Sequence, residues 1–166
     1  CMDHSHTAPD GDLLPAFLDA RYAVFLPEGP IELRPGRIFT TQRAPAGTPW
    51  ALLTAHNPRG VARPAGHNAA AQARLLAQLR DTGLPCWPGR NADANGKHAE
   101  DSVFTLGLET TAADALAHAF GQCALLAGRI GEPARLRCIR DCWPGPVVDT
   151  PFVDWVASDV AHPRSP

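Results

Sequence analysis

The chain has 166 residues, a formal net charge of −2 at pH 7 and a sequence pI near 6.4. This length suits a single domain whose core buries roughly two thirds of the surface of the unfolded chain. Nucleic acids and anionic membrane surfaces attract clustered positive charge, which this composition does not favour, so neither is an expected partner.

Membrane segments and secretion signals are not expected either. No apolar run approaches the roughly 20 residues that span a bilayer, and the first residues lack the charged and then apolar order of a secretory signal. We therefore expect a cytoplasmic protein, either a monomer or a weak homodimer. The odd number of cysteines, five, then favours free thiols over a disulfide framework. Cys1 precedes Met2, an order that leaves open whether Cys1 is native.

The composition divides the chain into three parts. Residues 1–14 are polar and predict a flexible N-terminus, in which His4 and His6 supply only half of a typical metal ligand set. Residues 15–145 are expected to form one α+β domain, and residues 146–166 a C-terminal tail that docks a short helix.

The first elements are predicted to be a helical turn and a hairpin. The turn is expected over residues 16–20. The segments RYAVFL (21–26) and IELR (31–34) carry branched and aromatic residues on either side of a Pro- and Gly-containing turn, which is typical of two antiparallel strands. The apolar run WALLTA (50–55) then predicts a central strand covered on both faces.

A helix is predicted over residues 68–80 by the spacing of its leucines. Leu75, Leu76 and Leu79 share one face, and Gly83 supplies the left-handed residue that often follows a helix.

Further strands are predicted at residues 84–87, 102–108, 123–128 and 134–139, with a long polar loop over residues 88–101. A second helix is expected to begin at Thr110 or Thr111, and its inward face is expected to comprise Ala113, Leu116, Ala117 and Phe120. Thr150 followed by Pro151 predicts the short C-terminal helix.

Residues 50–128 thus follow the order strand, helix, strand, strand, helix, strand, which is typical of ferredoxin-like folds. We therefore predict an α+β sandwich with a mainly antiparallel sheet, two helices on one face, an added N-terminal hairpin and a C-terminal strand. A three-layer α/β arrangement is the alternative.

This topology brings several polar segments to one edge of the sheet, where the first strand ends. The expected site residues there are His56, Asn57, Arg59, Asn68, Arg90, His98, Glu100, Ser102 and Gln122. A helix N-terminus beside arginines predicts a site for a small molecule or anion, with Asn57, Arg59, Asn68, Arg90, Ser102 and Gln122 as ligand-binding residues.

Two other functions remain open. His56 or His98 with Glu100 supplies the titratable groups of a small hydrolase or transferase. The aromatic residues Trp143, Phe152 and Trp155 pack internally or against a partner protein. A purely structural interpretation also stands, because Asn57-Pro58 commonly starts turns and Asn68 can cap a helix.

No metal site is predicted, and the identity of any cofactor stays unknown from the sequence. Cys138 and Cys142 are four residues apart, but zinc sites usually need a second such pair. Cys123 lies in an apolar strand, which favours a buried and inert thiol. The sequence contains neither a Walker loop nor a G-x-G-x-x-G motif.

The order of five short motifs resembles a bacterial family, the domain of unknown function 3293 (DUF3293). The motifs are TAHNP (54–58), Asn68, PGR (88–90), HAEDS (98–102) and FGQCA (120–124). The resemblance extends from about Tyr22 to Leu126, and it implies no particular activity. It marks the same edge as the topology does.

Overall fold

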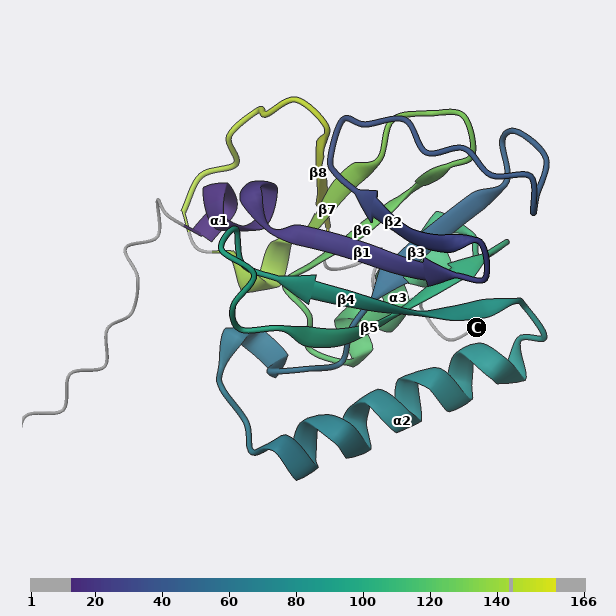
Figure 1. Cartoon of the computed structure of the whole chain (residues 1–166). Coiled ribbons are helices and arrows are strands. Elements are labelled where there is room, and N and C mark those ends of the chain that lie inside the picture. The colour runs from purple at the N-terminus through teal and green to yellow at the C-terminus, as the bar shows by residue number, and fades with distance from the viewer. Residues whose placement is uncertain (1–12, 144, 158–166) are drawn as a thin grey trace, which may run out of the picture.

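The computed structural model describes residues 13–143 and 145–157 and contains one eight-stranded sheet (Figure 1). Cys1, His4 and His6 lie outside the described residues, as does the end of the predicted tail. The elements in chain order are α1 Leu13–Asp19, β1 Arg21–Leu26, β2 Gly29–Leu33, β3 Pro49–Leu53, η1 Pro58–Gly60, α2 Ala65–Asp81, β4 Cys86–Ala92, β5 Glu100–Leu106, α3 Thr110–Ala119, β6 Ala124–Arg129, β7 Arg135–Ile139, η2 Arg140–Cys142 and β8 Val153–Val156.

The strand order is β2-β1-β4-β5-β3-β6-β7-β8. All neighbouring strands pair antiparallel except β7 and β8, which run parallel. The sheet is curled, so that β1 and β2 face β6 and β7 across its inner side (Figure 1). The chain after β2 crosses this opening and bridges to the start of β7, through Pro35 with Ala134 and Ile38 with Pro133.

Side-chain alternation along the strands produces one core on each side of the sheet. Trp50 and Leu52 of β3 point to the inner side, where Trp50, Phe39 and Phe104 pack with ring centroids 5.6–5.7 Å apart. Ala51 and Leu53 point to the outer side, which α2 and α3 cover. β3 is therefore buried on both faces, as its continuous apolar run predicts.

A third cluster forms where α1 packs against β6, β7 and β8 around Trp143. Phe17 of α1 and Trp155 of β8 both contact the Trp143 ring, with centroids 5.5 Å away in each case. The predicted C-terminal helix is wrong, because this segment forms β8. Phe152 has a left-handed φ of 61°, which interrupts a helix, and the open edge of β7 pairs with the following residues.

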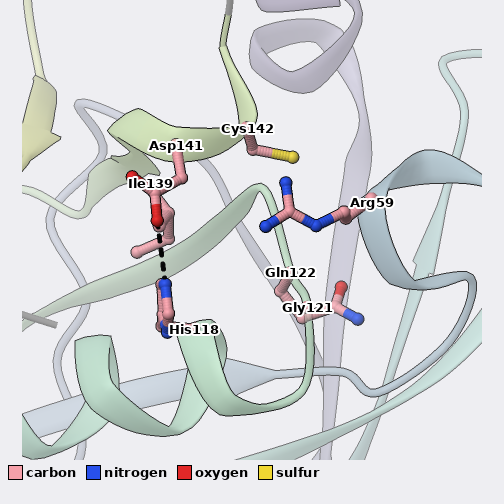
Figure 2. A pocket seen from close by; sticks show the side chains of 7 residues that line it. All are labelled: Arg59, His118, Gly121, Gln122, Ile139, Asp141 and Cys142. Carbon is pink, nitrogen blue, oxygen red and sulfur yellow. Dashed lines mark hydrogen bonds and ion pairs between the residues drawn. The ribbon is translucent and has the colours of Figure 1, made fainter. Parts of the chain in front are cut away.

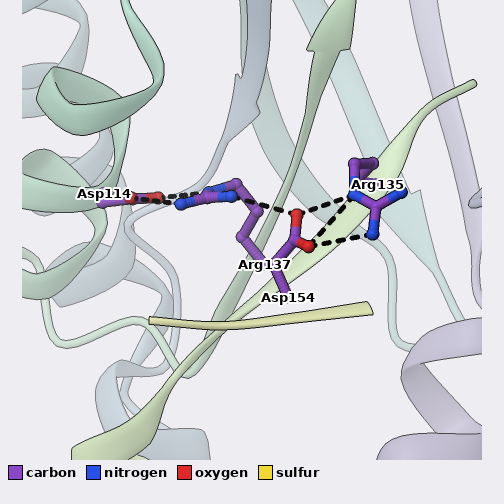
Figure 3. Close-up of polar contacts among 4 residues, drawn as sticks. All are labelled: Asp114, Arg135, Arg137 and Asp154. Atoms are coloured by element: carbon purple, nitrogen blue, oxygen red, sulfur yellow. Dashed lines mark hydrogen bonds and ion pairs between the residues drawn. The ribbon is translucent and has the colours of Figure 1, made fainter. Parts of the chain in front are cut away.

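An ion-pair chain connects α3 to the last two strands (Figure 3). Asp114 of α3 is fully buried and accepts two hydrogen bonds of 2.7 Å from Arg137 of β7. Arg137 also donates to Asp154 of β8 at 3.0 Å, and Arg135 holds the same carboxylate through both oxygens. These bonds fix β8 beside β7 and fix α3 over the sheet.

The predicted ferredoxin-like sandwich is wrong as a description of the fold. The sheet is mixed and has eight strands, and the described residues contain three α-helices, because residues 13–19 form α1. The inner side is not an exposed face but a second core, which the curl of the sheet and the crossing segment enclose. A single strand's alternation does not reveal what covers its second face.

The predicted loop over residues 88–101 is also wrong, because β4 continues to Ala92 and β5 begins at Glu100. Pro88 and Gly89 are unfavourable in isolated strands, but β1 and β5 pair with β4 on both sides. Gly89 is required there, since a Cβ would lie 2.6 Å from Ser102 Oγ and 2.9 Å from the Ala23 carbonyl.

None of the helices in the described part of the chain is long and apolar enough to cross a membrane.

Candidate functional site

The candidate site begins where β3 ends, and side-chain hydrogen bonds continue the line of that strand. Thr54 Oγ1 donates to the Asp101 carbonyl at 2.8 Å and accepts from the His56 amide at 3.2 Å. Gln72 Oε1, on the covering helix α2, accepts from the Ala55 amide at 2.9 Å. The backbone of the first residues after β3 is therefore held from both neighbouring elements.

Asn57 and Asn68 form the centre of the site. Asn57 has a left-handed φ of 46°, a conformation that asparagine tolerates better than most residues. Asn68 Oδ1 accepts from the Asn57 amide, and Asn68 Nδ2 donates to Asn57 Oδ1, both at 2.9 Å. Asn57 Oδ1 also accepts from the Arg63 amide at 2.9 Å.

The predicted capping role of Asn68 is wrong. Helix α2 begins at Ala65, after Pro64 in the N-cap position, and Asn68 lies inside the first turn with 7% of its surface exposed. Its side chain instead holds the loop that precedes the helix. Only the three-dimensional path of that loop assigns Asn68 this function.

Glu100 joins this network from the first position of β5. Asn57 Nδ2 donates to Glu100 Oε1 at 2.8 Å. Burial raises the pKa of Glu100 above its ordinary value, and the hydrogen bond from Asn57 and the nearby charge of His56 offset the increase only in part. The carboxyl group thus binds its proton more tightly than a carboxyl group in water does.

His56 lies between Gln122 and Glu100. Gln122 Nε2 donates to the His56 carbonyl at 3.0 Å and to the Phe120 carbonyl at 3.3 Å, which ties the end of α3 to the end of β3. His56 Nε2 is buried and forms no hydrogen bond within the described residues. Buried ring nitrogens are usually hydrogen-bonded, so this atom is an exception that calls for an explanation.

Four other side chains each bury one polar atom that makes no hydrogen bond to the described residues, namely Trp50, Gln72, Asn91 and Ser102. Trp50 Nε1 lies in the inner core beside Phe39 and Phe104, away from the loop that carries His56. The Gln72 amide nitrogen belongs to the side chain that holds Ala55 on the outer side of the sheet. Ser102 is 3% exposed and lies against Gly89 in the sheet interior. Its hydroxyl is therefore enclosed by the strands rather than presented at a surface.

Arg59 lies beside this network in η1, where it adopts a left-handed φ of 56°. Its amide donates to the Gly121 carbonyl at 2.6 Å. Gly121 also has a positive φ, of 69°, and a Cβ there would lie 2.7 Å from Pro58 Cβ. The close approach of these two loops fixes the backbone from which the Arg59 side chain extends.

A small pocket of about 10 Å³ opens beside Arg59, with room for about one water molecule (Figure 2). The Arg59 guanidinium points into this pocket. His118 of α3 and Asp141 of η2 face each other on its far side, with Nε2 and Oδ2 3.0 Å apart. The remaining lining residues are Gly121, Gln122, Ile139 and Cys142.

Two predicted site residues lie elsewhere. Arg90 is exposed in the middle of β4. His98 is 88% exposed in the turn between β4 and β5, where its Nε2 lies 4.0 Å from an oxygen of Asp93. Within the described residues, neither side chain hydrogen-bonds to His56 or Glu100.

The structure therefore unites five of the predicted residues, namely His56, Asn57, Asn68, Glu100 and Gln122, and places Arg59 beside them. Sequence reasoning missed Gln72, although it is four residues after Asn68 and therefore on the same helix face. It also missed the pair of His118 and Asp141, because nothing local connects two residues that lie on different elements.

The fold and the site define an α+β protein with a buried polar network at one edge of a curled sheet. The family described as "Protein of unknown function (DUF3293)" matches residues 53–125. The match confirms the resemblance expected from the motifs, and it begins later than the expected Tyr22. None of the curated proteins and none of the solved structures compared with the chain matches it.

Proposed function

We propose that the edge formed by His56, Glu100 and Arg59 binds a small polar molecule or anion. The observation that carries the proposal is His56 Nε2, which is buried and makes no hydrogen bond to the described residues. A ligand group that bonds to this nitrogen would remove the cost of burying it alone, which is about 1–3 kcal/mol for a typical polar group.

Most of the surrounding polar groups support this use by holding the loop rather than by contacting a ligand. Asn57, Asn68 and Gln122 hydrogen-bond to one another and to backbone groups, and Asn57 also donates to Glu100. A rigid frame of this kind orients a binding residue precisely. His56 and the exposed guanidinium of Arg59 are then the groups that remain for a ligand.

The size and charge of the site restrict the ligand. The pocket beside Arg59 has room for about one water molecule, so the bound group is small unless the Arg59 side chain moves. A cationic guanidinium favours an anionic group, such as phosphate or carboxylate. We therefore propose a compact oxyanion, or the oxyanion end of a larger molecule.

Acid–base catalysis is the second candidate function. The raised pKa of Glu100 and its electrostatic coupling to His56 provide a proton donor and an acceptor at one place. His98 no longer contributes to this alternative because it is exposed in a different turn. The partner-binding alternative loses part of its basis, since Trp143 is buried and Trp155 packs against it.

The test is a titration of the full chain with phosphate, sulfate and acetate, followed by NMR of the histidine ring protons. We expect the His56 resonances to shift and saturate, and the melting temperature to rise with ligand concentration. His56→Gln and Arg59→Ala should remove both effects.

The matched controls are His67→Gln and Arg74→Ala, because both residues are exposed on α2. These variants should bind as the unmodified chain does. If none of the three anions shifts the His56 resonances, or if the control variants lose the response equally, the proposed anion site is wrong.

A further inference from the structure

A disulfide joins Cys123, just before β6, to Cys142 at the end of η2, with their Cα atoms 5.1 Å apart. The expectation that the thiols are free is wrong for this pair, including the inert thiol expected at Cys123. The spacing along the chain is 19 residues, so only the packing of η2 against the end of α3 brings the two sulfurs together. Cys86 and Cys138 remain free.

The two cysteines of the disulfide differ in their access to solvent. Cys123 is only 8% exposed, whereas Cys142 is partly exposed and lines the pocket that also contains Arg59. Figure 2 shows the Arg59 guanidinium on the side of the pocket where the Cys142 sulfur lies. A reagent that approaches the disulfide from solvent therefore meets Cys142 first, on the side of the pocket where Arg59 places its positive charge.

A cation next to a sulfur favours the thiolate over the thiol, and the thiolate is the form that attacks and leaves in exchange reactions. The backbone of Arg59 is held in place by its hydrogen bond to Gly121 and by its left-handed conformation. Its charge is thus supplied by a fixed loop. Such an arrangement is typical of reactive cysteines rather than of structural ones.

Opening the disulfide would not release the segment that carries Cys142. The Cys123 carbonyl accepts hydrogen bonds from the Ile139 amide at 2.9 Å and from Trp143 Nε1 at 2.7 Å. Trp143 is also held between the rings of Phe17 and Trp155. These contacts do not depend on the bond between the sulfurs, so the dithiol form can keep the fold.

We propose that the Cys123–Cys142 disulfide is redox-active and exchanges with thiols at the Cys142 sulfur. The thiolate of a dithiol reductant attacks Cys142 Sγ, the bond between the two sulfurs breaks, and Cys123 leaves as a thiolate that takes a proton from water. The second thiolate of the reductant then attacks the reductant's own sulfur in the mixed disulfide. Cys142 leaves as a thiolate beside Arg59, and the reductant becomes a cyclic disulfide.

This inference does not rest on the proposed anion site, and its first test uses dithiothreitol on the full chain. Graded ratios of reduced to oxidised dithiothreitol are followed by alkylation with iodoacetamide and by mass spectrometry of the cysteine peptides. We expect Cys123 and Cys142 to open together and reversibly, while circular dichroism and the Trp fluorescence stay native. A pair that opens only when the chain unfolds would overturn the proposal.

The second test measures the alkylation rate of Cys142 in the reduced chain from pH 5 to pH 9. Arg59→Ala should slow the reaction at pH 7 by about tenfold, because the thiolate fraction falls tenfold for each unit by which the thiol becomes a weaker acid. Arg59→Lys should keep most of the rate, and Arg74→Ala all of it. Cys138 serves as an internal control, because burial raises its pKa to about 12.

An equal alkylation rate of Cys142 in the unmodified chain and in the Arg59→Ala variant would show that Arg59 does not activate Cys142. If the Arg59→Ala variant does not fold, the pH dependence of Cys142 alkylation in the unmodified reduced chain tests the proposal instead. A Cys142 rate at pH 6 no higher than that of the same chain unfolded in urea would contradict the proposal.

Discussion

Asn57 and Asn68 form two hydrogen bonds with each other across the loop between β3 and α2, and each bond is 2.9 Å long. In one bond the Asn68 side chain accepts from the Asn57 backbone amide, and the other bond joins the two side chains. The pair therefore holds both the position and the left-handed conformation of Asn57. This relationship sets the direction of the chain between His56 and Arg59. The site therefore depends on a pair that needs no contact with a ligand.

Asn68→Ala should lower the free energy of unfolding by about 1–3 kcal/mol, because it leaves a backbone amide and the Asn57 side chain partly unpaired in a buried place. Urea unfolding followed by Trp fluorescence measures the loss. Gln78→Ala, on the exposed side of the same helix, should change stability by no more than about 0.5 kcal/mol. Equal stability of the two variants would show that the Asn pair does not hold the loop.

Glu100→Gln should stabilise the chain at neutral pH. The raised pKa of Glu100 means that the folded state binds the proton more tightly than the unfolded state does. Ionisation of Glu100 therefore lowers the free energy of unfolding. The contribution of the protonated Glu100 to stability is fully present below the ordinary pKa of about 4.3, and it is lost as the pH rises through the higher pKa of the folded state. Gln keeps an oxygen for Asn57 Nδ2 but does not ionise.

Melting temperatures from pH 4 to pH 8 test this prediction. The Glu100→Gln variant and the unmodified chain should coincide at the acid end, and the variant should melt higher at pH 7 and above. Glu132→Gln, at an exposed position, should follow the unmodified chain throughout. If the Glu100→Gln variant loses as much stability between pH 4 and pH 8 as the unmodified chain does, Glu100 is not the cause of that loss.

Asp114→Ala should destabilise the chain by about 3–5 kcal/mol, because it leaves Arg137 without the partner that holds its guanidinium at two points. The measurement is chemical denaturation, together with hydrogen exchange of the β8 amides. Those amides should exchange faster, since Arg137 also holds Asp154. The matched control is Asp81→Ala at the exposed end of α2, where little change is expected.

Gly89→Ala should cost about 1–3 kcal/mol through overpacking. The added Cβ would lie 2.6 Å from Ser102 Oγ, 2.8 Å from Leu52 Cδ1 and 2.9 Å from the Ala23 carbonyl. Gly66→Ala provides the opposite control, because its Cβ position meets no atom within 4 Å beyond its chain neighbours and the nearby backbone of α2, and it should stabilise by up to about 1 kcal/mol. Thermal unfolding compares the two. A Gly89→Ala variant as stable as the unmodified chain would show that β4 can shift to accept it.

The candidate site was partly predictable because its residues follow directly from the ends of strands and helices. His56 stands where the apolar run of β3 stops, and Gln122 where α3 ends, so their approach follows from the placement of the elements. Glu100 was expected in a loop rather than in a strand, yet it reaches Asn57 all the same. Arg90 and His98 were misplaced because the predicted loop is a hairpin, in which Arg90 lies within β4 and His98 is exposed in the turn.

The sequence by itself determined the local elements, since the alternation of Leu52 and Leu53 or the spacing of Leu75 and Leu79 is a property of neighbouring residues. Only the tertiary structure decided the roles that require distant partners. Val153–Val156 becomes a strand because β7 offers an open edge, Asp114 becomes buried because Arg137 lies opposite, and Cys123 meets Cys142 because η2 folds back. The free energy that stabilises each of these features comes from a contact between residues distant in the sequence. Patterns among neighbouring residues therefore cannot predict them.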